Sequence, residues 1–189
     1  MDAQSRRRRL ESLADERDPA RRRLVALALV ADRLAEDGIE PILVGGAALE
    51  VYTAGGYATG DVDLALPTSP EVDCAFADLG FQKRGRFWLR DDLDLVFEAP
   101  APAGLPGETA PRTELSVEGL RVVVIGVEDL LLDRVRGAVH WRSDEDRRWA
   151  RRLALLHAER IDWRYLAEKS AGHAEERGEI DKLREEVGR

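Results

Sequence analysis

The chain has 189 residues, of which 44% are apolar, so it is long enough for one domain with a buried core and too apolar for intrinsic disorder. Its 37 acidic and 29 basic residues give a net charge of −8, which argues against a general nucleic-acid-binding protein. No apolar run approaches the roughly 20 residues of a membrane span, and no apolar signal segment follows the arginines at 6–9, so we expect a soluble, cytoplasmic protein. The single cysteine, Cys74, excludes an intramolecular disulfide, and three widely separated histidines argue against a zinc site.

Apolar residues at helical spacing predict a helix over residues 20–37, which Gly38 ends, and a weaker helix over residues 4–16. The four arginines at 6–9 are expected to form an exposed, flexible arm, with RNA phosphates as an alternative contact.

The middle of the chain alternates between short apolar runs and helical patterns. Residues 42–44 and 62–66 are expected to be strands, because both runs are short and glycine or proline stands near their ends. A helix over residues 47–52 separates them. Ser69 and Pro70 begin a further helix, which ends at Gly80.

Residues 81–90 and 93–97 are expected to form an antiparallel pair joined near Asp91 and Asp92. A loop over residues 99–111 follows, and residues 120–125 form one more strand. The remainder is helical in pattern, in segments listed here: 127–139, 143–156, 162–168 and 173–186.

This order of elements predicts an α+β fold, in which helices flank a small mixed β-sheet. We expect an N-terminal helical segment over residues 1–40, a core over 41–126, and a helical C-terminal segment over 127–189 that packs on the core.

The most informative residues are three aspartates in the core segment. Asp61 and Asp63 are two apart in a strand and project from the same face, where their charges repel unless a cation lies between them. Oxygen-only ligands favour Mg²⁺ or Mn²⁺. Asp94, between two core leucines, supplies a third carboxylate from a later strand, and such a set can hold two metal ions for phosphoryl chemistry. Glu98 is expected to lie past the end of that strand, on the surface.

Two glycines and the local charge fit the same chemistry. Gly45 and Gly46 follow a strand and open a helix, so their backbone amides can approach a triphosphate. Residues 41–100 contain ten acidic and four basic residues, so most of the negative charge lies around the expected metal site.

The glycine pair, a helix-sized interval and the Asp-x-Asp motif resemble the nucleotidyltransferase superfamily of the DNA polymerase beta type, especially its small prokaryotic branch of AbiEii-like toxins and minimal nucleotidyltransferases. The resemblance is best over residues 42–66 and 93–97. It implies that Gly45 and Gly46 bind nucleotide phosphates and that Asp61, Asp63 and Asp94 bind two Mg²⁺ or Mn²⁺ ions.

Three features depart from the family pattern. Gly46 replaces a frequent serine, and Tyr57 stands where an arginine is common. The lysine that many family members have on a helix after the sheet is not evident in this sequence. Arg134 or Arg136 is expected to replace it as a nucleotide contact; the alternative is that both are solvated helix residues.

The resemblance implies transfer of a nucleoside monophosphate from an NTP to a hydroxyl of an RNA end or a protein, in a toxin–antitoxin pair with a cognate antitoxin. Two alternatives are a catalytically silent binding protein of the same fold and a nucleotidyltransferase for small molecules such as aminoglycosides. The motif from His140 to Arg142 either stacks an acceptor base or anchors the core through Trp141.

Overall fold

The structure is a computed structural model that describes residues 1–102, 105 and 107–188. Its helices are α1 (Ala3–Glu11), α2 (Pro19–Leu34), α3 (Gly45–Tyr52), α4 (Pro70–Asp78), α5 (Val127–His140), α6 (Asp144–Leu156), α7 (Trp163–Lys169) and α8 (Ala174–Val187), with short 3₁₀ helices η1 (Ser12–Asp15), η2 (Ala35–Asp37) and η3 (Asp91–Leu93). Its strands are β1 (Ile42–Leu43), β2 (Val62–Ala65), β3 (Gln82–Arg84), β4 (Phe87–Arg90), β5 (Leu95–Ala101), β6 (Thr113–Val117) and β7 (Leu120–Val124).

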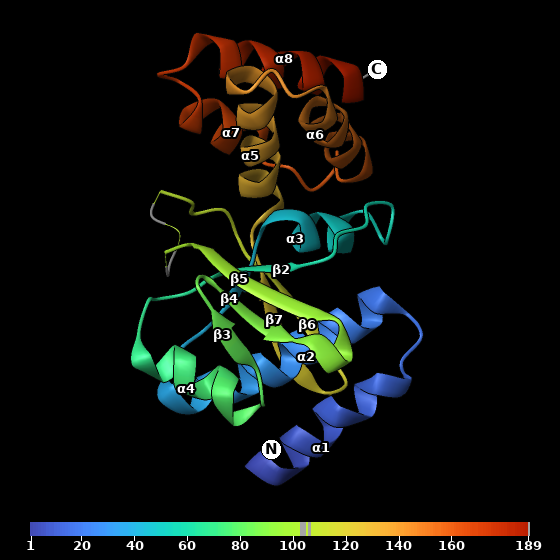
Figure 1. The fold of residues 1–189 in the computed structure, drawn as a ribbon. Coiled ribbons are helices and arrows are strands. Elements are labelled where there is room, and N and C mark those ends of the chain that lie inside the picture. Colours follow the sequence, from blue (N-terminus) through green and yellow to red (C-terminus); the bar gives the residue numbers. More distant parts are fainter. Residues whose placement is uncertain (103–104, 106, 189) are drawn as a thin grey trace.

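The strands form one mixed sheet in the order β3-β4-β5-β2-β1-β7-β6. Strand β2 is parallel to β5 and antiparallel to β1, and β1 is parallel to β7. Helices α2 and α4 contact each other and lie against the sheet, whereas α3 lies between the sheet and the C-terminal helices α5–α8 (Figure 1). The expected α+β architecture is confirmed.

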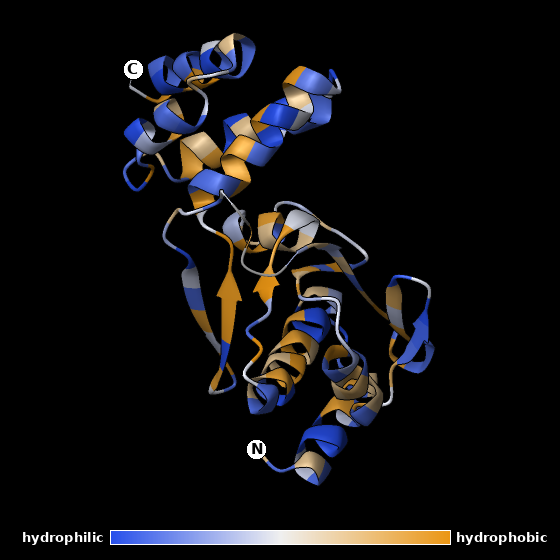
Figure 2. Cartoon of the chain, turned by 90° about the vertical axis from the view of Figure 1, so that its left-hand side faces the viewer, coloured by the Kyte–Doolittle hydropathy of each residue, from blue (hydrophilic) through white to orange (hydrophobic). Residues whose placement is uncertain are grey.

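Apolar residues gather along the strands and on the helix faces turned toward them (Figure 2). Phe76 of α4 stacks on Trp88 and meets Phe81 and Phe97 edge-on, and these rings fix β4 and β5 against α4. Because side chains alternate along a strand, burial of Phe97 in this cluster turns the next residue, Glu98, to the opposite face of the sheet.

Several expected boundaries were wrong. Residues 81–90 form a hairpin of two strands, β3 and β4, because Gly85 adopts a left-handed turn conformation between them. Strand β5 extends into the expected loop. Strand β6 was missed, although its half-buried residues 113, 115 and 117 alternate with the exposed residues 114 and 116 as in an edge strand. Residues 103, 104 and 106 of that loop lie outside the described residues.

The arginines at 6–9 do not form a flexible arm, because they belong to α1. Arg6 is only 1% exposed and forms ion pairs with Asp32 in the last turn of α2 and with Glu36 in η2. Arg9 pairs with Glu118, which follows β6. These contacts attach α1 to the rest of the protein.

Candidate active site

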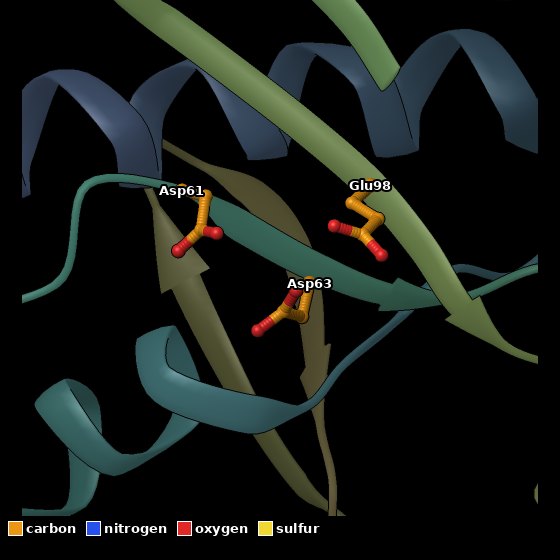
Figure 3. Close-up of side chains that lie close together, drawn as sticks. All are labelled: Asp61, Asp63 and Glu98. Atoms are coloured by element: carbon orange, nitrogen blue, oxygen red, sulfur yellow. The ribbon is translucent and has the colours of Figure 1, made fainter. Parts of the chain in front are cut away.

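Asp61 and Asp63 lie at the start of β2 on the face of the sheet that α3 covers (Figure 3). The backbone carbonyl of Asp63 accepts a hydrogen bond of 2.9 Å from the amide of Val44, so its position is fixed by the sheet. The Asp61 carboxylate accepts a bond of 2.7 Å from the Thr59 hydroxyl. The expected placement of these two carboxylates side by side is observed.

The third carboxylate of this cluster is Glu98, not Asp94. The Cα atoms of Glu98 and Asp63 are partners in the parallel pairing of β5 with β2, so both side chains point to the same face. Asp61, Asp63 and Glu98 each have a carboxylate oxygen within 4.8 Å of those of the other two (Figure 3). Within the described part of the chain, this is the one group of three or more potential metal ligands that lie so close together. Glu98 is buried, which contradicts the surface position expected for it.

Asp94 does not reach this cluster. It ends η3 in a left-handed conformation, with φ of 51°, and is exposed one residue before β5 begins. The preceding turn is closed by the ion pair of Arg90 with Asp92. Four residues of extended chain span up to about 13 Å, so Asp94 and Glu98 are far apart along the direction of β5.

Period-two alternation places residues 94, 96 and 98 on one face, and this was the sequence signal that could have identified Glu98. The signal was missed because the strand was expected to end at residue 97.

The glycine pair forms the N-terminus of α3 directly beside Asp63. The amide of Gly46 lies 3.4 Å from Asp63 Oδ2 and donates to it. Gly45 has φ of +59°, and a Cβ atom on it would lie 2.2 Å from Asp63 Oδ2. A Cβ atom on Gly46 would lie 3.1 Å from the Thr59 hydroxyl oxygen. Glycine is therefore required at residue 45 by both backbone conformation and space.

The three carboxylates repel one another, and this repulsion affects the pKa of Asp63. Burial raises the pKa of Asp63 above its ordinary value; the charges of Asp61 and Glu98 raise it further, while the Gly46 amide and Arg134 lower it. The cation paired with the cluster is Arg86, whose Nε lies 3.2 Å from Glu98 Oε1. A divalent ion would relieve this repulsion, and three carboxylates are the donor set that Mg²⁺ or Mn²⁺ prefers, so the residues fit such an ion.

The two arginines of α5 lie on different sides of the helix. Arg134 forms ion pairs with Asp133 and Asp146, and its charge acts on Asp63; its Nε atom is buried without a hydrogen-bond partner in the described chain. Arg136 instead pairs with Glu176 of α8. Residues two apart in a helix point about 200° from one another, so Arg134 and Arg136 cannot both face the carboxylates, and the charge that acts on Asp63 is that of Arg134.

Two aromatic residues singled out in the sequence, Tyr57 and Trp141, have different surroundings. Tyr57 meets Trp149 of α6 edge-on, with ring centroids 5.0 Å apart, in the segment between the glycine pair and Asp61. Trp141 is 82% exposed at the end of α5, so it does not anchor the core.

None of the helices in the described ranges is long and apolar enough to span a membrane.

No protein-family model and no curated protein matches the sequence. Several solved structures match the fold, among them the following two. The first is an antigenic nucleotidyltransferase-like protein from Paracoccidioides brasiliensis, 17% identical, with a TM-score of 0.59 over 89% of this chain and 93% of that one. The second is ANT(2")-Ia in complex with adenylyl-2"-tobramycin, 17% identical, with a TM-score of 0.51 over 78% of this chain and 94% of that one. The chain therefore has the nucleotidyltransferase fold.

Proposed function

We propose that the protein is a metal-dependent nucleotidyltransferase that moves a nucleoside monophosphate from an NTP to a hydroxyl group. The observation that carries this proposal is the cluster of Asp61, Asp63 and Glu98 at the N-terminus of α3. Three carboxylates from two strands, next to backbone amides that can bind phosphate, match the needs of this reaction. The nucleotidyltransferase fold supports the same assignment.

Each group has a defined task in this proposal. Asp61, Asp63 and Glu98 would hold the divalent ions, which would supply positive charge for the phosphates of the NTP. The amides of Gly45 and Gly46 approach the triphosphate. Arg134 supplies positive charge from α5, in place of the helical lysine of the family.

The reaction forms one bond and breaks one bond. The oxygen of the acceptor hydroxyl binds the α-phosphorus, and the bond from the α-phosphorus to the bridging oxygen breaks, so that pyrophosphate leaves. The hydroxyl proton is lost to water or to a neighbouring carboxylate. Glu98 is buried and Asp63 is half-buried, so these two carboxylates are partly shielded from bulk water.

For the acceptor, we propose the end of an RNA or a protein hydroxyl, within a toxin–antitoxin pair, as the resemblance to the AbiEii-like branch implies. A small cationic acceptor is the second candidate, because one similar structure holds an adenylylated aminoglycoside. An RNA and an aminoglycoside would give labelled products of very different size.

The test is transfer of radiolabel from each α-labelled NTP, with Mg²⁺ or Mn²⁺, to total RNA, to lysate protein and to a set of aminoglycosides. We expect label on one acceptor class with the wild type and none with Asp63→Asn. Asp91→Asn, at an exposed acid outside the cluster, is the matched control and should transfer like the wild type. Absence of label on every acceptor, or equal transfer by Asp63→Asn, would refute the proposal.

A further inference from the structure

The β3–β4 hairpin carries an arginine to the edge of the carboxylate cluster. We infer that Arg86 competes with the divalent ion for Glu98 and, once the ion has bound, contacts the triphosphate of the nucleotide. This inference rests on the proposed function and assigns a residue to the binding of its substrate.

The hairpin geometry places Arg86 beside Glu98. Gly85 makes the turn with φ of +62°, Arg86 follows it, and Phe87 is the register partner of Glu98. The Arg86 guanidinium lies 5.0 Å from the centre of the Phe87 ring, and its Nε lies 3.2 Å from Glu98 Oε1. The ring therefore supports the guanidinium over the open edge of the cluster.

The two partners of this ion pair differ strongly in burial. The Glu98 side chain is 9% exposed, whereas that of Arg86 is 71% exposed. An attraction to such a solvated cation is screened by water and is therefore weak. A divalent ion at the same carboxylate carries twice the charge and is held by two more carboxylates. The ion should therefore displace Arg86 from Glu98.

A displaced Arg86 retains donors that suit phosphate. A guanidinium has five N–H groups in a planar fork that matches two phosphate oxygens, and the ion pair of Arg86 with Glu98 is made through Nε. Arg86 contacts Glu98, and the Gly46 amide contacts Asp63, so the guanidinium and the phosphate-binding amides adjoin two members of the same cluster. The other nearby arginine, Arg134, is already held by Asp133 and Asp146.

The test compares Arg86→Gln with Arg84→Gln, an exposed arginine two residues earlier that pairs with Asp91. Titration of Mn²⁺ followed by electron paramagnetic resonance measures metal binding without activity. We expect Arg86→Gln to bind Mn²⁺ about fivefold more tightly than the wild type, because a competing charge is removed, and Arg84→Gln to bind like the wild type.

The second readout is the KM for the NTP that serves as substrate. Arg86→Gln should raise KM about tenfold with a smaller effect on kcat, and Arg86→Lys should restore part of the loss. Unchanged Mn²⁺ binding or unchanged KM in Arg86→Gln would overturn the inference.

Failure of the proposed function gives a different result. If the wild type binds Mn²⁺ but transfers no nucleotide, that function is refuted, while the Mn²⁺ comparison still decides whether Arg86 competes for Glu98.

Discussion

Asp63 and Glu98 are direct partners across the parallel strands β2 and β5, and their carboxylates meet on the face of the sheet beside α3 (Figure 3). This pairing joins two segments that are 35 positions apart in the sequence. It also selects Glu98 rather than Asp94 as the third acidic residue of the site.

Glu98→Gln should abolish nucleotidyl transfer, whereas Asp94→Asn should leave it within about twofold of the wild type. Loss of a metal ligand should cost at least on the order of 100-fold, because even groups that only orient such ligands cost up to that much. The measurement is initial rate of label transfer at saturating Mg²⁺, with circular dichroism to check folding. A loss of activity in Asp94→Asn but not in Glu98→Gln would instead identify Asp94 as the third metal ligand.

Gly45→Ala should both destabilise the protein and remove activity. A residue with a Cβ atom in the left-handed conformation costs about 1 to 2 kcal/mol, and here the Cβ atom would also displace the Asp63 carboxylate. Urea unfolding measures the loss of stability, and label transfer measures the loss of activity. Gly60→Ala is the matched control, because a Cβ atom there meets nothing within 4 Å, and it should change stability by less than about 0.5 kcal/mol.

Arg134→Gln should weaken nucleotide binding, and Arg136→Gln should not. Arg134 acts electrostatically on Asp63, whereas Arg136 pairs with Glu176 on another side of α5. We expect the KM for the NTP to rise about tenfold in Arg134→Gln, because this change corresponds to the loss of one charge-assisted contact. Arg134→Lys should recover much of the affinity, since the charge remains. Equal KM values for the two glutamine variants would contradict the assignment of Arg134.

Glu176 should make the stability of the C-terminal helices pH-dependent. It is only 2% exposed, and burial alone would raise its pKa, but hydrogen bonds from His140 and Arg136 outweigh burial, so the pKa lies below the ordinary value. A lowered pKa in the folded state stabilises the fold above the unfolded pKa, and this contribution is lost as the pH falls through the folded pKa.

Glu176→Gln should therefore lower the free energy of unfolding by about 1 to 3 kcal/mol at pH 7, and the difference from the wild type should shrink below roughly pH 4.3. Urea unfolding at a series of pH values measures this. Glu175→Gln, at an exposed neighbouring position, is the control and should show little difference at any pH. A difference for Glu176→Gln that grows toward acid would contradict the predicted sign.

Local patterns in the sequence were sufficient for the elements that hold Asp61, Asp63 and the glycine pair. Alternation in a short apolar strand depends on backbone geometry within a few residues, so it placed both aspartates on one face. The conformation of Gly45 is likewise a local property of the turn into α3. The Ser69 side chain likewise caps a helix through a nearby amide, and it was identified correctly as the start of α4.

The sequence by itself thus determined the α+β class, the Asp-x-Asp pair and the glycine turn. Only the tertiary structure decided that Glu98 completes the cluster, that Arg134 acts electrostatically on Asp63 while Arg136 pairs with Glu176, and that Arg86 pairs with Glu98. Each of these depends on the register between strands or on how α5 packs on α3 and α8. Register is set by the fit of many side chains distant in sequence, and a shift of one residue would turn Glu98 to the opposite face.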